Sequence, residues 1–237
     1  MAPRTYQYDT DLVMVDGTVV KTTVTSDGNA VQRFLREVQA TCSDGGGLDV
    51  GIDTEWRNVH QPNGTRTYRT AVLQLCAGRR SLIFHIAHAN YVPHALRRFL
   101  SRPEHRFFGV GVGGDVDRLA EDYGMEVESA VELTALAVEV LGRPELDRAG
   151  LKALAQEVMG VCIDKQKRIT LSNWAAARLS REQVQYACMD AFVSYEVGRL
   201  LLAGEGAEGA VTRATISQFV SPFPGAPRMV PGWIPLP

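Results

Sequence analysis

Two pairs of polar side chains in this sequence lie where burial is expected. The segment DVGIDTEW has the composition of a strand, so Asp53 and Glu55 stand on one face, about 7 Å apart along it. On a late helix, Tyr186 and Asp190 lie one turn apart inside a broad apolar arc. A buried carboxylate needs a positive partner. An arginine or a solvated acidic edge strand is the ordinary explanation, and a metal ion shared by several carboxylates is the catalytic one.

A further acidic position follows a glycine-rich segment. In GVGVGGDVDRL, Gly109, Gly111 and Gly114 satisfy the G-x-G-x-x-G pattern of a dinucleotide-binding turn. Asp115 comes next, at the start of a predicted helix, where its charge would repel a pyrophosphate. The pattern also requires an acidic residue at the end of a strand about 20 residues later, whereas Glu132 lies in a segment predicted to be helical. A nucleotide-cofactor oxidoreductase is therefore disfavoured, and helix capping is the structural alternative for Asp115.

The acidic residues, which are far apart along the chain, point to one kind of chemistry if the fold brings them together. Two hard cations about 3.5–4 Å apart require a cluster of oxygen ligands. In such sites one ion activates the attacking water and the other stabilises the leaving oxygen of a phosphodiester. The residue types therefore indicate phosphodiester hydrolysis or formation.

The predicted elements form a single α/β domain with a mixed β-sheet flanked by helices. A β-hairpin is expected at about residues 6–25, followed by alternating strands and helices and then mostly helices. The last helix is predicted from residue 181 to about 202, with a capping box at its start. We therefore expect a domain at 1–203 and a flexible tail at 204–237, rich in Gly and then in Pro, without regular structure.

Composition narrows the class of protein further. The net charge is −2, so the chain as a whole lacks the excess of positive charge that favours binding to nucleic acid. Its content of 45% hydrophobic residues is typical of globular proteins. With no signal-peptide pattern and no run of about 18 apolar residues, we expect a soluble intracellular protein of the nucleus or cytoplasm, without a membrane contact. The pair His85 and His88 is interpreted as structural. The four cysteines are expected to be free thiols: Cys42, Cys76, Cys162 and Cys188.

Taken together, these motifs resemble the DEDDy 3′–5′ exonucleases, which have a ribonuclease H-like fold. The order is Asp-Thr-Glu on a strand, Asp after a Gly-rich segment, and Tyr-x-x-x-Asp on a late helix. The segments VGIDTEW, AVLQLC, FFGVGVGGDVDRL, LKALAQEVMG and SNWAAARLSREQVQYACMDAF resemble the Werner syndrome-type branch, which is related to ribonuclease D. The resemblance covers about residues 6–202. The length leaves no room for a helicase, so we expect a stand-alone member.

The resemblance implies both a site and a reaction. Asp53, Glu55, Asp115 and Asp190 would bind two Mg²⁺ or Mn²⁺ ions, and Tyr186 would orient the attacking water together with Glu55. The enzyme would remove nucleoside 5′-monophosphates from the 3′ end of DNA or RNA. The glycines before Asp115 would permit close backbone packing, and the polar stretch after Glu55 would border the substrate entrance.

A basic segment before the last helix is the predicted contact to nucleic acid. Its side chains could bind phosphates or stack on a base, although a solvated loop and, for the tryptophan, an anchoring role are the alternatives. The candidates are Lys165, Lys167, Arg168, Trp174 and Arg178, with weaker claims for Arg57, Arg79 and Arg80.

A second hypothesis keeps the fold without the reaction. The chain would then be a non-catalytic nucleic-acid-binding or scaffold protein, with the Pro-rich tail as a protein contact. Retention of all five positions that the resemblance assigns to catalysis speaks against this hypothesis.

Overall fold

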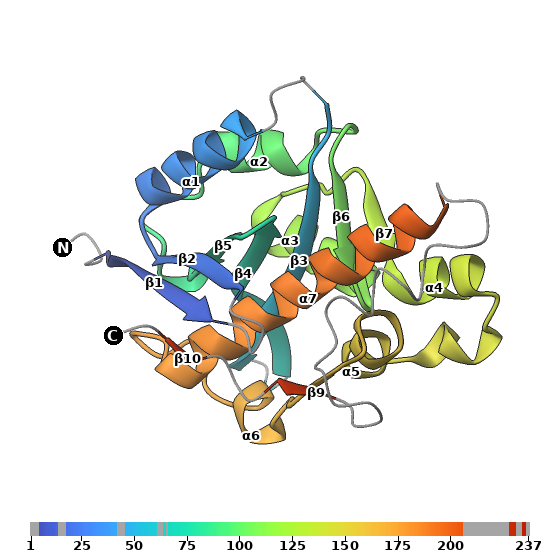
Figure 1. The fold of residues 1–237 in the computed structure, drawn as a ribbon. Helices are drawn as coiled ribbons and strands as arrows, with labels where there is room; N and C mark the ends of the chain where they lie inside the picture. Colours follow the sequence, from blue (N-terminus) through green and yellow to red (C-terminus); the bar gives the residue numbers. More distant parts are fainter. Residues whose placement is uncertain are drawn as a thin grey trace.

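A mixed β-sheet forms the centre of the structure (Figure 1). The computed structural model describes residues 5–13, 18–41, 46–60, 64, 66–205, 228–230 and 234–235. Within them the strand order is β10-β1-β2-β5-β4-β3-β6-β7. The strands of this sheet are β1 (Gln7–Val13), β2 (Val19–Thr25), β3 (Asp49–His60), β4 (Arg66–Ala77), β5 (Arg80–Phe84), β6 (Arg106–Gly109), β7 (Ala130–Glu132) and β10 (Ile234–Pro235).

The direction in which neighbouring strands pair follows from the segments that connect them. Strands β1 and β2 pair antiparallel, as the hairpin pattern predicts, and β3, β4 and β5 also run antiparallel to their chain neighbours. The predicted turn between β1 and β2 lies outside the described residues. Strands β3, β6 and β7 pair in parallel because helices connect them. The expected α/β class with a mixed sheet is thereby confirmed.

Helices cover both faces of this sheet and create two apolar cores. On one face lie α1 (Gly28–Ala40), α2 (His94–Leu100) and α3 (Val112–Tyr123). On the other face lie α4 (Leu133–Leu141), α5 (Leu151–Leu154) and α7 (Arg181–Glu205), and Figure 1 shows α7 crossing in front of β3 and β4. Alternation along β6 serves both cores, because Phe107 faces one and Phe108 the other.

Short segments complete the α7 side of the molecule. They are η1 (Ile86–His88), η2 (Pro144–Arg148), the π-helical turn η3 (Ala155–Met159), β8 (Val161–Ile163) and α6 (Lys167–Thr170). The loop between α6 and α7 is fixed to the sheet by histidine. Buried His85 bonds the Tyr6 hydroxyl at 2.7 Å and the Trp174 carbonyl at 3.0 Å, and His88 bonds the Ala175 carbonyl. Both histidines therefore have the structural role expected of them.

Two short strands correct the expectation that residues 204–237 lack regular structure. Strand β9 (Arg228–Val230) pairs in parallel with β8, and β10 pairs antiparallel with β1 at the edge of the main sheet. Proline lacks a backbone donor, so Pro235 is compatible with an edge strand although not with a central one. The last helix also extends to Glu205, beyond the predicted boundary.

The predicted helical segment at residues 130–142 also begins later in the structure than the sequence indicates. Ala130–Glu132 instead forms β7, and the helix begins only at Leu133. The apolar run has no signal that separates a three-residue parallel strand from the first turn of a helix. The structure thus places Glu132 at the end of a strand. None of the described helices is both long and apolar enough to cross a membrane.

Candidate active site

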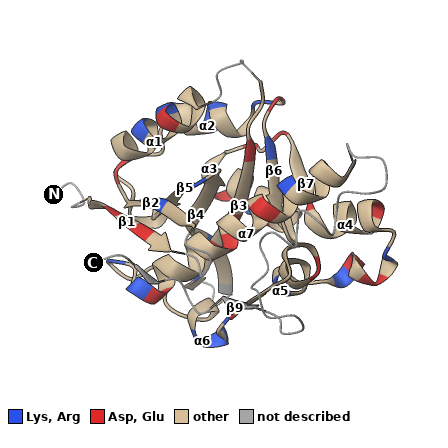
Figure 2. Ribbon diagram, in the orientation of Figure 1, with Lys and Arg blue, Asp and Glu red and all other residues tan. Residues whose placement is uncertain are grey.

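The crossing of β3 and α7 brings three carboxylates together. Asp53, Glu55 and Asp190 each offer an oxygen atom, and these atoms lie within 4.8 Å of one another. Figure 2 shows acidic positions on α7 where it crosses β3. The close approach depends on Gly51, because a Cβ at this position would lie 1.9 Å from the carbonyl oxygen of Ala191. Glycine therefore lets the backbone of α7 contact β3 directly.

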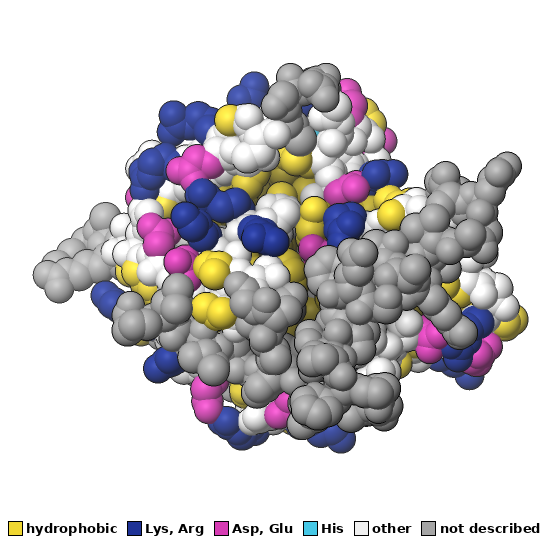
Figure 3. Space-filling model, viewed as in Figure 1, with side chains coloured by type: hydrophobic (Ala, Val, Ile, Leu, Met, Phe, Trp, Pro, Cys, Tyr) yellow, Lys and Arg dark blue, Asp and Glu magenta, His cyan; other side chains and the backbone are white. Residues whose placement is uncertain are grey.

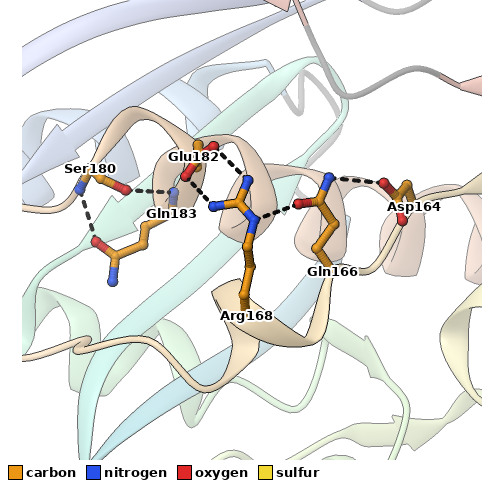
Figure 4. Close-up of polar contacts among 6 residues, drawn as sticks. All are labelled: Asp164, Gln166, Arg168, Ser180, Glu182 and Gln183. Atoms are coloured by element: carbon orange, nitrogen blue, oxygen red, sulfur yellow. Dashed lines mark hydrogen bonds and ion pairs between the residues drawn. The ribbon is translucent and has the colours of Figure 1, made fainter.

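The start of α7 is fixed by the predicted capping box (Figure 4). The Gln183 amide donates to Ser180 Oγ at 3.2 Å, and the Ser180 amide donates to the Gln183 side chain at 2.8 Å. Beside it, Arg168 binds Glu182 through two nitrogen atoms at 2.6 and 2.7 Å. These contacts fix where α7 begins and tie its first turn to α6.

A lysine and a tyrosine surround the Asp190 carboxylate. Lys165 Nζ lies 2.7 Å from Asp190 Oδ2 and 5.2 Å from the centre of the Tyr186 ring. The Tyr186 hydroxyl accepts a hydrogen bond from Thr170 at 3.0 Å. Asp190 Oδ1 is buried and has no hydrogen-bond partner among the described residues. This oxygen atom is free to bind a cation.

Asp115 reaches the site from the other face of the sheet. It lies in the first turn of α3, and its Oδ1 accepts a hydrogen bond of 2.5 Å from Thr54. Asp115 is outside the group of oxygen atoms within 4.8 Å, yet its charge raises the pKa of both Asp53 and Glu55. The structure thus brings three of the four predicted ligands into one cluster and places the fourth beside it.

The glycine-rich segment positions Asp115 and does not form a phosphate site. Gly111 has φ of +69°, a conformation that favours glycine, and it begins α3. The Val112 amide at this helix start donates to Glu132 Oε2 at 3.1 Å. The sequence argument that Glu132 lies in a helix is wrong, but its carboxylate occupies the place that a phosphate would need. The argument against a dinucleotide site therefore rests on the bond between Glu132 and the Val112 amide, and not on the predicted helix at Glu132.

Burial raises the pKa values of these carboxyl groups. The pKa of Asp53 lies well above its ordinary value because of burial and then of the charges of Asp190 and Asp115. Burial, followed by the charge of Asp53, raises the pKa of Glu55 to about 10. Burial also raises the pKa of Asp115 to about 6, although the hydrogen bond from Thr54 opposes the shift. Crowded carboxylates of this kind need positive charge in order to ionise together.

The tyrosine and the lysine respond to the same environment. Burial and then the charge of Asp190 raise the pKa of Tyr186, which keeps its hydroxyl protonated near neutral pH. Burial opposes the charge of Lys165, but the carboxylates of Asp190 and Asp53 outweigh it and raise the pKa of this ammonium. Lys165 therefore supplies one positive charge, which is fewer than the surrounding carboxylates require.

The donor set fits divalent hard cations. Carboxylate oxygens are the ligands that Mg²⁺ and Mn²⁺ prefer, and the free oxygen atom of Asp190 points to a missing partner. Neither nitrogen nor sulfur ligands belong to the cluster found among the described residues. The free thiols of Cys76, Cys162 and Cys188 are likewise outside it, and Cys42 lies outside the described residues.

The residues predicted to contact nucleic acid have different surroundings in the structure. Lys165 lies in the carboxylate cluster, and Lys167 is exposed at the start of α6. Arg168 is paired with Glu182, and Arg178 lies over the Tyr6 ring at 5.4 Å. Trp174 is only 1% exposed and donates to the Thr170 carbonyl, so it anchors the loop and is not accessible to a base. The anchoring alternative is therefore the correct one for this residue.

The weaker basic candidates lie elsewhere. Figure 3 shows Lys and Arg side chains over α1 and the neighbouring edge of the sheet, interspersed with acidic ones. Arg80 is paired with Glu37 in this region. Arg57 follows Glu55 by two residues, and its Nε is buried without a hydrogen-bond partner among the described residues.

Sequence reasoning did not identify two polar residues that shape the site. Thr54 binds Asp115, and Thr170 binds the Tyr186 hydroxyl. For Thr54 a signal was present, because it stands between two candidate ligands on a strand. Thr170 carries no comparable signal, since its contact depends on how α6 folds back on α7.

A mixed sheet with helices on both faces, carrying an acidic cluster where its central strand meets a late helix, defines the ribonuclease H-like class. A family model described as 3′–5′ exonuclease matches residues 23–202, and the chain therefore belongs to the 3′–5′ exonuclease domain family. This finding confirms the resemblance to 3′–5′ exonucleases inferred from the motifs.

Relatives agree with the assignment, and a solved structure has a similar fold. A mouse bifunctional 3′–5′ exonuclease/ATP-dependent helicase WRN is 37% identical over 67% of this chain, and an Arabidopsis thaliana 3′–5′ exonuclease is 31% identical over 76%. The chain spans 11% of the first relative and 62% of the second. Escherichia coli RNase D has a similar fold, with a TM-score of 0.64 at 19% identity over 82% of this chain and 48% of that one.

Proposed function

We propose that this chain is a metal-dependent 3′–5′ exonuclease that hydrolyses phosphodiester bonds and releases nucleoside 5′-monophosphates. The observation that carries the proposal is the buried carboxylate cluster of Asp53, Glu55 and Asp190 with Asp115 beside it. Membership of the 3′–5′ exonuclease domain family supports the same reaction. Nucleic acid with a free 3′ end is the proposed substrate.

The four carboxylates would hold two Mg²⁺ or Mn²⁺ ions. When bound, these ions would supply an activated water and charge stabilisation at the phosphate and the leaving oxygen. Asp190 contributes the oxygen atom that lacks a partner, and Asp53 and Glu55 approach it from the facing strand. Thr54 holds the Asp115 carboxylate in place through a hydrogen bond.

Tyr186 is proposed to position the water that attacks the phosphorus. Its hydroxyl is protonated at neutral pH, since burial raises its pKa above the ordinary value of 10, and it can therefore donate a hydrogen bond. Thr170 donates a hydrogen bond to the same oxygen atom and holds the tyrosine hydroxyl in place. Glu55 lies within the carboxylate cluster and would accept a hydrogen bond from the water.

Digestion of a 5′-labelled strand tests the proposal directly. Wild-type protein with Mg²⁺ or Mn²⁺ should produce a ladder of shortened products, and EDTA should abolish it. Asp53→Asn and Asp190→Asn should each lower the rate by at least about 100-fold, because each removes a charged ligand of the metal ions that would stabilise the transition state. Asp49→Asn is the matched control, since Asp49 is on the same strand but is paired with Arg106 at 2.7 Å.

A thermal-unfolding series with Mn²⁺ gives an independent readout. Binding to the native state should raise the unfolding temperature of wild type and Asp49→Asn, and Asp53→Asn should lose most of this response. Intact substrate under every metal condition, together with strand binding that does not depend on metal, would instead favour the non-catalytic binding protein.

A further inference from the structure

We propose that Trp56, Tyr68 and Arg118 form an aromatic platform on which an unpaired base of the substrate strand stacks beside the candidate active site. The inference rests on the proposed function, because it assigns a strand of nucleic acid to the neighbouring carboxylates. None of these three residues belongs to the basic segment before α7.

The platform is an exposed arrangement of rings on neighbouring strands. Trp56 is 41% exposed and Tyr68 is 53% exposed. Their ring centres are 5.0 Å apart and the rings are nearly perpendicular, at 82°. Register explains the contact, because Trp56 pairs with Thr70 and Asn58 pairs with Tyr68 across β3 and β4. Trp56 and Tyr68 are therefore diagonal neighbours on one face.

An arginine from α3 completes the platform. The Arg118 guanidinium lies 5.3 Å from the centre of the Trp56 ring. Arg118 forms no ion pair within the part of the chain that the structure describes, and its Nε is buried without a hydrogen-bond partner there. A guanidinium in this state carries charge that a phosphate can neutralise. Aromatic rings beside such a charge offer both contacts that a nucleotide can use.

The platform lies on the α3 side of the sheet, next to Asp115. Trp56 follows Glu55 in β3, and a β-bulge between the two residues changes the register with β4. Arg118 lies one helical turn after Asp115, and its charge lowers the pKa of that carboxyl against the effect of burial. Bulges often redirect side chains next to active sites. A nucleotide whose phosphate lies at Asp115 would thus have its base on the side of these rings.

Single-stranded nucleic acid is the occupant that these features favour. Every base presents a stacking face, so the platform would bind without strong sequence preference. The bases of an intact duplex are already stacked on one another, and an exposed ring competes for them only when they are unpaired. The chemical class is therefore an unpaired nucleotide with an accessible base.

Binding of a fluorescent single-stranded oligonucleotide, measured by anisotropy in EDTA, tests the platform without cleavage. We expect Trp56→Ala to weaken binding by about tenfold or more, the usual effect of losing one base-stacking ring. Trp56→Phe should recover most of the affinity. Tyr91→Ala is the matched control, since Tyr91 is 39% exposed but lies near α1, and it should bind like wild type. An oligonucleotide with abasic positions should bind wild type and Trp56→Ala equally weakly.

Cleavage then separates the platform from the chemistry. With Mn²⁺, Trp56→Ala should lower the ratio of activity on the oligonucleotide to activity on the p-nitrophenyl ester of thymidine 5′-monophosphate by about tenfold. An unchanged ratio, or equal binding of normal and abasic strands by wild type, would overturn the platform. If wild type cleaves neither substrate the proposed function fails, while the binding measurements in EDTA still decide whether bases stack on Trp56.

Discussion

At the scale of single residues, the candidate site combines too many negative charges with too few positive ones. Burial raises the pKa of Asp53 and of Glu55, and Asp190 keeps an oxygen atom without a hydrogen bond. Lys165 is the cation in contact with Asp190 among the described residues. The ammonium contacts Oδ2, whereas a metal ion would bind the free Oδ1 of the same carboxylate, so the two positive charges should repel each other and compete for the charge of Asp190.

The competition predicts that Lys165→Met binds Mn²⁺ more tightly than wild type. We expect an increase of about tenfold in affinity, at the low end of the energies measured for close charge pairs. Titration calorimetry measures it, and the shift of the unfolding temperature with Mn²⁺ provides a second readout. Lys165→Arg retains the charge and should stay near the wild-type affinity. Equal or weaker Mn²⁺ binding by Lys165→Met would show that the charge of Lys165 does not oppose the metal ion.

At the scale of elements, the site depends on how closely one helix approaches one strand. Helix α7 carries Asp190, and β3 carries the facing carboxylates at alternate positions. Gly51 removes the side chain that would keep their backbones apart. The start of the helix is fixed separately, by the capping box at Ser180, and the ion pair of Arg168 with Glu182 ties its first turn to α6.

Gly51→Ala should therefore weaken the fold as well as the site. Its Cβ would overlap the Ala191 carbonyl, and backbone cannot move away as a side chain can, so we expect a loss of stability of about 3 kcal/mol or more. Chemical denaturation measures the loss. Gly113→Ala is the control, because a Cβ at that position of α3 meets nothing within 4 Å, and it should be neutral or stabilising by about 1 kcal/mol. A Gly51→Ala protein as stable as wild type would show that α7 can shift without cost.

Periodicity predicts the elements that position the site better than the contacts within it. Alternation on β3 and the apolar arc of α7 were sufficient to select Asp53, Glu55 and Asp190 for the interior. Nothing in the sequence specifies that Lys165 folds back onto Asp190, because this contact depends on a loop whose path tertiary packing determines. The bond from Thr54 to Asp115 depends on how α3 packs against β3, which periodicity does not specify either. The assignment of Glu132 to a helix failed for a related reason, since its strand is only three residues long.

At the scale of the whole molecule, one histidine joins three distant segments. His85 follows β5, and its ring binds the Tyr6 hydroxyl near the N-terminus and the Trp174 carbonyl before α7. Burial lowers the pKa of His85 to about 4, from 6.5, and the neighbouring His88 adds to the shift. The neutral ring is therefore part of the packing between the N-terminal hairpin and the loop that leads to α7.

This arrangement predicts a loss of stability in mild acid. Below about pH 6.5 the unfolded chain binds a proton at His85, whereas the folded protein stays neutral until the pH approaches 4. Stability should therefore fall as the pH decreases between these values, by at most about 3 kcal/mol. Denaturant unfolding between pH 7 and pH 4.5 measures the effect. His85→Gln cannot titrate and should show a smaller slope, so parallel curves for the two proteins would contradict the prediction.

The alternation of β3 has a consequence for which changes this chain can tolerate. Deleting one residue between Asp49 and Gly51 would turn Asp53 and Glu55 toward the opposite core and bring Ile52 and Thr54 to face α7. A substitution at one of these positions changes one side chain, but a change in length moves every following side chain of the strand to the opposite face of the sheet. Insertions and deletions should therefore be far less acceptable in this strand than exchanges of residue type.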